Sequence, residues 1–222
     1  MLATNELKYV LFDWDDTLAI TRNVIVHSVE KVLAKYGLPK WEISRLKRDE
    51  NLSFRDNFPN VFGTDLAKQA YEDYKVEYEK NVAHFIQKPK GSDEVLKKLK
   101  DNGIKLMIMT NKDRKLFEPE FSELYSPDLF EKIVCGHEAK KDKPFPEHGW
   151  KALEGFLNPE EISPQKVWVV GDSRQDLDCA VNMNALPILI GKPIWGEIIS
   201  ENNVLKFDSF VTFFDFISFD FV

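Results

Sequence analysis

A short apolar run near the start of the chain stops at a cluster of acidic residues. Tyr9-Val10-Leu11-Phe12 is uniformly apolar, and Asp13-Trp14-Asp15-Asp16-Thr17 follows it directly. Such a run suits a strand that is buried on both faces, as strands of a parallel sheet are. The acidic residues then fall at the carboxyl end of the strand, where α/β sheets place their functional groups.

Four further apolar runs have the length of buried strands, at residues 105–109, 133–135, 167–170 and 186–190. Polar residues or glycine follow the first three. Helical patterns lie between the runs, for instance at 92–102, where Gly103 marks the end, and around 150–157. Strands that alternate with helices predict an α/β fold with a Rossmann-like parallel sheet covered on both faces.

Residues 19–90 break this alternation. Apolar residues from Ile25 to Tyr36 recur at helical spacing, a loop-like stretch covers 40–63, and a second helical pattern covers 66–85. We therefore expect a helical cap domain at 19–90, inserted into a core domain made of 1–18 and 91–222. At the other end of the chain, Phe210, Phe213, Phe214 and Ile217 fall at helical spacing and predict a terminal helix that packs on the core.

Composition and charge exclude several classes of protein. The chain is 43% hydrophobic and 30% charged, values typical of a globular protein and not of a disordered one. A net charge of -7 opposes binding to the phosphate backbone, so nucleic acid is not expected as a partner. No apolar run approaches the roughly 18 residues of a membrane span, and the N-terminus lacks an apolar signal segment, so no membrane partner and a cytoplasmic location are expected. Cys135 and Cys179 lack metal-site or disulfide spacing and are expected to be reduced, partly buried thiols.

The acidic cluster indicates cation and phosphate chemistry. Asp13 and Asp15 are two residues apart, so an extended chain would turn both carboxylates to one side. Two like charges this close are costly unless a cation offsets them, and Mg²⁺ prefers oxygen ligands of this kind. A carboxylate can also attack a phosphoryl group directly. Taken alone, however, an Asp-x-Asp pair also fits a solvated loop or a helix cap.

Three more blocks join the first in an order that resembles the haloacid dehalogenase superfamily of phosphohydrolases. Each block also has an ordinary structural interpretation on its own, as turn, surface charge or helix cap, so the joint pattern carries the resemblance. In chain order the blocks are Asp13-Trp14-Asp15-Asp16-Thr17, Met109-Thr110-Asn111, Lys143-Pro144 and Gly171-Asp172-Ser173-Arg174-Gln175-Asp176.

The resemblance implies roles for the first block. Asp13 would be the nucleophile and a magnesium ligand. Asp15 would protonate the leaving oxygen and later activate water, while its backbone carbonyl binds the metal.

The other blocks would complete the site. Thr110 and the backbone amide of Asn111 would bind the phosphoryl oxygens, and Lys143 would supply fixed positive charge. Asp172 would be a further magnesium ligand. Asp176 would reach the metal through water or support Lys143.

The resemblance extends to a phosphoglycolate-phosphatase-like subgroup with a small helical cap. It rests on Gly91-x-x-x-Val95-Leu96-x-x-Leu99-x-x-x-Gly103 and on the position of the insertion. In that subgroup the cap supplies substrate contacts. The candidates here are Trp41, Arg45, Lys47, Arg48 and Arg55. Asp16, Thr21-Arg22 and Asn182-Met183-Asn184 depart from the usual pattern, so no particular substrate is carried over.

The expected function is magnesium-dependent hydrolysis of a small phosphorylated metabolite through an aspartyl-phosphate. A phosphomutase stays open as an alternative because it shares these blocks. A non-catalytic binding protein on the same fold is also open, although such a protein would be free to lose Asp13, Asp15 or Lys143. A carbon–halogen hydrolase is disfavoured because that branch lacks the second aspartate. The sequence sets no oligomeric state.

Overall fold

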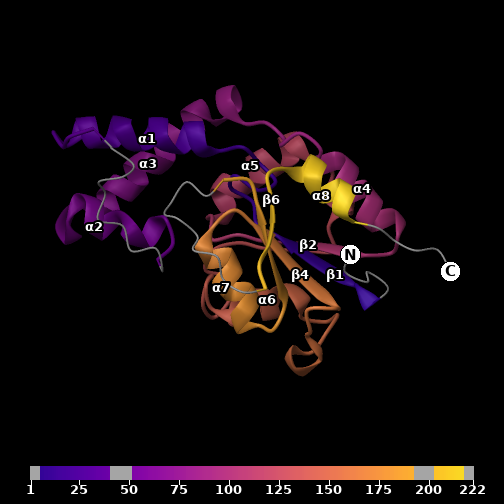
Figure 1. Cartoon of the computed structure of the whole chain (residues 1–222). Coiled ribbons are helices and arrows are strands. Elements are labelled where there is room, and N and C mark those ends of the chain that lie inside the picture. The colour runs from indigo at the N-terminus through magenta and orange to yellow at the C-terminus, as the bar shows by residue number, and fades with distance from the viewer. Residues whose placement is uncertain (1–5, 41–51, 193–202, 218–222) are drawn as a thin grey trace.

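A six-stranded parallel sheet forms the centre of the molecule (Figure 1). The computed structural model describes residues 6–40, 52–192 and 203–217. Across the sheet the strand order is β3-β2-β1-β4-β5-β6, which confirms the expected α/β class. The strands are β1 (Tyr9–Phe12), β2 (Lys105–Met109), β3 (Lys132–Val134), β4 (Val167–Gly171), β5 (Leu186–Ile190) and β6 (Leu205–Phe207).

Strand β1 lies in the middle, between β2 and β4. Phe12 is paired with Ile108 on one side and with Val170 on the other. The chain first builds outward through β2 and β3 and then returns to the other side of β1 at β4. The carboxyl ends of β1, β2 and β4 therefore meet at a topological switch point, the usual position of a ligand site in open α/β sheets.

Most helices connect the strands, whereas the first three α-helices form a separate group. In chain order the α-helices are α1 (Arg22–Lys35), α2 (Phe58–Phe62), α3 (Thr64–Phe85), α4 (Ser92–Asp101), α5 (Arg114–Leu124), α6 (Pro146–Leu153), α7 (Arg174–Asn182) and α8 (Phe210–Phe216). Three 3-10 turns, η2 (Arg55–Asn57), η3 (Pro127–Leu129) and η4 (Pro159–Glu161), lie among them.

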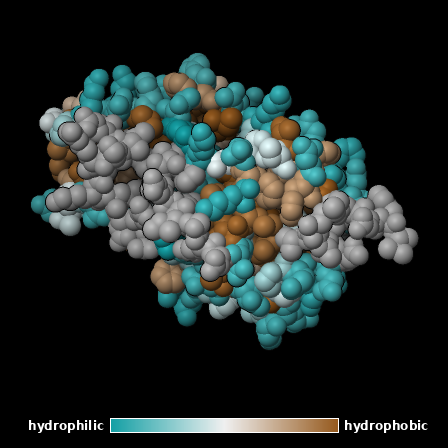
Figure 2. All heavy atoms as spheres, in the orientation of Figure 1, coloured by the Kyte–Doolittle hydropathy of each residue, from teal (hydrophilic) through white to brown (hydrophobic). Residues whose placement is uncertain are grey.

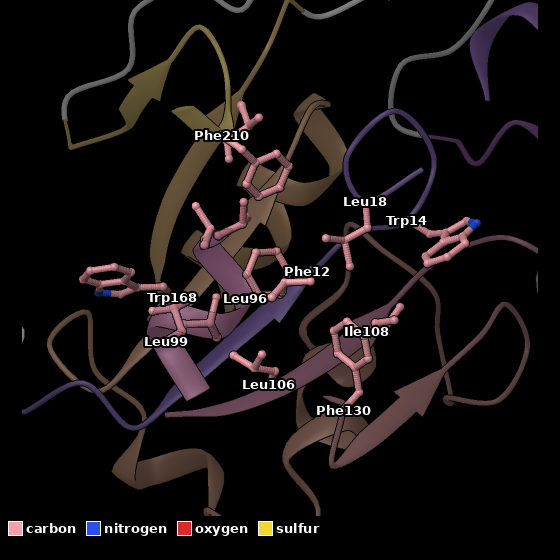
Figure 3. Close-up of a cluster of buried hydrophobic side chains, with 14 of the residues drawn as sticks. Phe12, Trp14, Leu18, Leu96, Leu99, Leu106, Ile108, Phe130, Trp168 and Phe210 are labelled. Carbon is pink, nitrogen blue, oxygen red and sulfur yellow. The ribbon is translucent and has the colours of Figure 1, made fainter. Parts of the chain in front are cut away.

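Two apolar layers cover the two faces of the sheet. Alternate strand residues point to opposite faces, so Phe12 meets α4, α5 and α8, whereas Leu11 lies in the layer formed with α6 and α7. Figure 3 shows Leu96 and Leu99 of α4 lying beside Phe12 and Leu106 in the first layer. The terminal helix α8 belongs to this layer through Phe210 and Phe213, as its spacing predicted.

Helices α1, α2 and α3 pack on one another beyond the edge of this core (Figure 1). Their shared cluster includes Val29, Phe58 and Tyr74, and Leu116 of α5 joins it from the core side. The chain enters and leaves this helical group through neighbouring segments, because the Ile20 N–H donates to the Gln87 carbonyl at 2.9 Å in an antiparallel bridge.

Several elements differ from the sequence prediction. The stretch expected to be loop-like at 40–63 contains α2, which begins with Pro59 in its first turn and buries Phe58 and Phe62. Helix α6 ends at Leu153, because Gly155 adopts φ +90° just beyond it, so the apolar pattern that continues to residue 157 is not helical there. Strand β6 was not predicted at all.

The cysteines and the surface have the character expected of a globular chain. Cys135 and Cys179 are both free and buried. In the view of Figure 2 hydrophilic residues lie mainly around the outline of the molecule, and hydrophobic residues gather near its middle. Among the described residues, no helix combines the length and the apolar character that crossing a membrane requires.

Candidate active site

The polar residues of the four sequence blocks meet at the carboxyl edge of the sheet. Asp13 follows β1, Thr110 follows β2 and Asp172 follows β4. Backbone hydrogen bonds extend the sheet to the first two of them: the Asp13 N–H donates to the Val170 carbonyl and the Thr110 N–H to the Val134 carbonyl, each at 2.9 Å. All three side chains line one cavity, together with Asp15, Asn111 and Lys143.

Lys143 lies between two buried carboxylates. Its Nζ is 2.5 Å from Asp13 Oδ1 and 2.6 Å from Asp176 Oδ1. An ammonium group has three donors, and two of them point at these oxygens. Among the described residues no further acceptor is found for Lys143 Nζ, so one donor is left for an oxygen of a bound substrate.

The loop that carries Lys143 is held by Asn111. The Asn111 Nδ2 donates to the Lys143 carbonyl, and the Lys143 N–H donates to Asn111 Oδ1, both at 2.9 Å. The same N–H lies 3.2 Å from His148 Nδ1. The side chain of Asn111 therefore positions Lys143, a role beyond the backbone contact that the sequence resemblance implied.

Both carboxylate oxygens of Asp176 accept hydrogen bonds from neighbouring groups. Oδ1 accepts from Lys143, while Oδ2 accepts from the Ser173 N–H at 3.1 Å and from Ser173 Oγ at 2.6 Å. Ser173 precedes α7, so these contacts also cap that helix. A Cβ on Gly171 would lie 2.3 Å from the Asp176 carboxyl carbon, which explains the glycine in the fourth block.

Negative charge is in excess at this point. Asp13, Asp172 and Asp176 offer oxygens within 4.8 Å of one another, and Lys143 is the ammonium in contact with two of them. Burial, with repulsion from Asp176, raises the pKa of Asp13 to about 7. Burial and the charges of Asp13 and Asp176 raise the pKa of Asp172 well above its usual value. A hard cation with oxygen ligands would relieve this repulsion, so the residues fit a metal such as Mg²⁺.

The Asp15 side chain lines the same cavity as Asp13, and its hydrogen bonds are to other groups. The chain turns sharply after β1, where the Trp14 carbonyl accepts the N–H groups of Thr17, Leu18 and Ala19 at 2.9–3.2 Å. Asp15 Oδ1 lies 2.7 Å from Lys112 Nζ and 2.7 Å from Thr21 Oγ1.

Asp16 makes the turn possible. It adopts φ +55°, a left-handed conformation that glycine or aspartate accepts more readily than most residues. Its Oδ1 accepts from the backbone N–H groups of Thr21 and Arg22 at 3.2 and 3.0 Å, at the start of α1. Aspartate therefore replaces the more usual glycine without disturbing the turn.

Sequence reasoning missed a buried charged group next to Asp15. Lys112 contacts Asp15, and its Nζ also lies 2.8 Å from Glu120 Oε1 and 2.8 Å from the Tyr78 hydroxyl. Burial alone would lower the pKa of Lys112, but Asp15 and Glu120 raise it above its usual value, so the amine stays charged. A signal was present in the sequence, because Glu120 falls on the apolar face of α5, between Phe117 and Phe121.

One predicted cap residue, Arg55, joins the helical group to the core. Its two terminal nitrogens lie 2.8 Å from Asp113 Oδ1 and 2.9 Å from Asp142 Oδ2. Tyr71 of α3 donates to the other oxygen of Asp113 at 2.9 Å. Arg55 lines the cavity, but its guanidinium is already paired. The other four candidates, at 41, 45, 47 and 48, lie outside the described residues.

Fold and site together define an α/β protein with a carboxylate-rich centre at the switch point of its sheet. The chain belongs to the haloacid dehalogenase-like hydrolase family, whose sequence model matches residues 10–190. The family resemblance drawn from the sequence blocks is thereby confirmed.

Individual relatives share the family across most of their length. The chain is 24% identical over 201 residues to a phosphoglycolate phosphatase from Aquifex aeolicus, covering 90% of this chain and 91% of that protein. It is 26% identical over 176 residues to an N-acetylmuramic acid 6-phosphate phosphatase from Pseudomonas aeruginosa, covering 78% and 76%. The crystal structure of a predicted phosphoglycolate phosphatase from Haemophilus somnus 129pt matches with a TM-score of 0.79 at 20% identity, covering 95% of this chain and 98% of that one. This last likeness shows a shared fold.

Proposed function

We propose that this hydrolase is a magnesium-dependent phosphatase that acts on a small phosphorylated metabolite, with Asp13 as its nucleophile. The observation that carries the proposal is the state of the Asp13 carboxylate. Lys143 holds Oδ1 at 2.5 Å in a buried site, and Oδ2 makes no hydrogen bond among the described residues. A fixed carboxylate with one free oxygen in a cavity is suited to in-line attack on phosphorus.

The reaction takes two steps. In the first, Asp13 Oδ2 forms a bond to phosphorus while the bond from phosphorus to the leaving oxygen breaks, and Asp15 gives that oxygen a proton. In the second, Asp15 takes a proton from water, the water oxygen attacks phosphorus, and the bond to Asp13 breaks. Free phosphate leaves and Asp13 is restored.

The remaining residues bind the phosphoryl oxygens. Lys143 has a donor to spare. The Thr110 hydroxyl accepts from the backbone N–H of Lys112 at 3.1 Å. The hydroxyl hydrogen of Thr110 is therefore free to donate to a phosphoryl oxygen. The backbone amide of Asn111 would add a further donor. Such preorganised donors stabilise the charge that develops during transfer.

The metal would be held by the carboxylates of Asp13 and Asp172 and by the Asp15 backbone carbonyl. When bound, magnesium supplies positive charge to the phosphoryl oxygens. The raised pKa values of Asp13 and Asp172 support this assignment, because they reflect negative charge without enough compensation. Asp176, with both oxygens engaged, supports Lys143 instead of binding the ion directly.

The helical group at 19–90 would act as a cap over this site, with 1–18 and 91–222 as the core. Ile25, Phe54, Tyr71 and Tyr74 line the cavity from the helical side. The two relatives named above act on different phosphorylated compounds by name, so their names support a phosphatase without selecting a substrate.

Phosphate release by the wild-type protein and by Asp13→Asn tests the proposal. The panel contains sugar phosphates, nucleotides, phosphoglycolate and acetyl phosphate, each with magnesium and with excess chelator. The amide is nearly isosteric but is a poor nucleophile, so Asp13→Asn should lose more than about 1,000-fold in kcat with an unchanged circular dichroism spectrum. Chelation should also stop the wild-type reaction.

Near wild-type rates in Asp13→Asn, or full turnover in chelator, would overturn the assigned mechanism. Phosphorus NMR of the sugar phosphates separates the alternatives. Isomer conversion without phosphate release would identify a phosphomutase, and binding without any conversion would indicate a binding protein.

A further inference from the structure

Lys112 is a buried lysine beside the candidate acid, and three oxygens surround its ammonium group. Nζ lies 2.7 Å from Asp15 Oδ1, 2.8 Å from Glu120 Oε1 and 2.8 Å from the Tyr78 hydroxyl. An ammonium group has three N–H donors. Nζ donates to Asp15 and to Tyr78 and forms a close ion pair with Glu120 Oε1 that lacks hydrogen-bond geometry, so Lys112 is held by three groups, whereas Lys143 contacts two.

The partners of Lys112 are themselves fixed. Glu120 is fully buried in α5, and its Oε2 accepts from the indole nitrogen of Trp14 at 2.6 Å. Trp14 precedes Asp15 in the chain and packs edge-on against Phe117 of the same helix. Tyr78 reaches Lys112 from α3, in the helical group. The amine is therefore held from three directions.

A buried ion pair of this kind calls for a reason other than stability. Removing two charges from water is expensive, and well-packed apolar residues of similar volume often serve the fold equally well. Lys112 nonetheless lines the cavity together with Asp15, and Glu120 is buried against Lys112. Of the three partners of Lys112, Asp15 is the one whose side chain lines the cavity.

The contacts of Asp15 are asymmetric. Oδ1 accepts from both Lys112 Nζ and Thr21 Oγ1, whereas Oδ2 makes no hydrogen bond within the part of the chain that the structure describes. Asp15 also lines the cavity. One oxygen is thus occupied in holding the carboxylate, and the other is left to exchange a proton with substrate or water.

We infer that Lys112 is a positioning residue: anchored by Glu120 and Tyr78, it holds Asp15 Oδ1 so that Oδ2 is aimed at the leaving oxygen. This inference rests on the proposed phosphatase function. It assigns Lys112 no contact with substrate. It also makes proton delivery depend on a contact between α3 and the core.

Leaving-group dependence distinguishes this role from a structural one. An alkoxide needs a proton as it departs, whereas acetate departs from acetyl phosphate as a stable carboxylate. Loss of the Lys112 anchor should therefore slow an alkyl phosphate much more than acetyl phosphate. The ratio kcat/KM is the right quantity, because it covers only the steps up to departure of the leaving group.

The main variant is the double replacement Lys112→Met with Glu120→Gln. A single Lys112→Met would leave Glu120 buried without its cation and could unfold the protein. The double variant removes both charges, and the glutamine keeps an oxygen for Trp14. We expect roughly a tenfold to 100-fold loss of kcat/KM with the best alkyl phosphate of the panel, and less than about threefold with acetyl phosphate. Tyr78→Phe should shift the same ratio in the same direction by a smaller factor.

Lys115→Met is the matched control, since this lysine is exposed in the first turn of α5, three residues after Lys112. It should leave both substrates at wild-type rates. Equal losses on both substrates in a folded double variant, or no loss on either, would overturn the inference while wild-type turnover still supports the phosphatase. A wild-type protein that hydrolyses neither substrate would instead refute the proposed function itself.

Discussion

His148 shows, at the scale of one residue, how the site depends on a side chain that lies behind it. The imidazole is fully buried, with Nδ1 3.2 Å from the Lys143 N–H and Nε2 3.2 Å from the Val134 carbonyl. Nδ1 can accept this hydrogen bond only when it carries no proton. Burial, together with the nearby Lys143 ammonium, lowers the pKa of His148 to about 4.

This lowered pKa predicts a loss of stability on mild acidification. Between pH 6.5 and about 4 the unfolded chain binds a proton at His148 that the folded chain does not, so lowering the pH favours unfolding. The difference contributes up to about 1.4 kcal/mol per pH unit over this window, or about 3 kcal/mol in total. Urea denaturation at pH 7, 5.5 and 4.5 should show a shallower pH dependence in His148→Asn than in the wild-type protein.

His137→Asn is the control for this measurement. His137 is exposed and has φ +67°, a conformation that asparagine accepts. The free energy of unfolding of this variant should change with pH as it does in the wild-type protein. If His148→Asn loses as much free energy of unfolding on acidification as the wild-type protein does, His148 is not the buried neutral group described above.

At the scale of elements, Arg55 is the main polar link between η2 and the core. It pairs with Asp113, which precedes α5, and with Asp142, which precedes Lys143 in the chain. Its side chain is 12% exposed, so solvent screens these pairs less than it screens surface pairs. The contact ties the helical group directly to the loop that carries Lys143.

Replacing Arg55 by lysine should weaken this link while keeping the charge. A single ammonium cannot serve both carboxylates with the fork geometry of arginine. We expect Arg55→Lys to lower kcat/KM by roughly threefold to tenfold and to speed tryptic cleavage of the folded protein at sites in the helical group. Arg114→Lys, which alters a more exposed pair with Glu138 inside the core, should change neither. Equal effects of the two substitutions would show that Arg55 is no special link.

Elements were predictable where their pattern was strong. Strands β1, β2 and β4 could be predicted from continuous apolar runs, because a parallel strand that is buried on both faces needs apolar residues at nearly every position. Strand β6 has the partly buried pattern of an edge strand and only three residues, so no run marked it. Helix α2 has only 5 residues, too few to show a helical period in the sequence.

The site divides in the same way into features that are local in the sequence and features that are not. The four blocks named Asp13, Thr110 and Asp172, which follow strands directly, and Lys143, which lies in a loop, because each block is a short run of neighbouring residues. The direction of the Asp15 carboxylate depends on Lys112, Glu120 and Tyr78, which come from three distant segments. No local pattern encodes such a meeting, although a glutamate on the buried face of α5 hinted at it.

At the scale of the whole molecule, the described residues form three apolar clusters, and the third of them lines one side of the cavity. Two of them sandwich the sheet, and the third belongs to α1, α2 and α3 with Leu116 of α5. The third cluster is mostly self-contained, which suggests that the core can fold without it. The antiparallel bridge between Ile20 and Gln87 brings the two ends of the helical group side by side, so a short turn could replace it.

A chain in which a four-residue Gly-rich turn replaces residues 21–86 should therefore fold but lose most of its activity. We expect a cooperative thermal transition, because all the buried residues of both sheet layers remain and only the partly buried Ile86 is lost from the first. The shortened chain lacks Thr21, Arg55 and Tyr78, so Asp15 loses two of its supports and the cavity loses its helical wall. The rate with alkyl phosphates should fall by more than about 100-fold, since misplacement of a reacting group costs about that much. The control inserts the same turn after Gly155 in the full chain and should keep both fold and activity. A shortened chain that fails to fold would show that core and helical group form one cooperative unit, and one that keeps full activity would show that the helical group is not needed to aim Asp15.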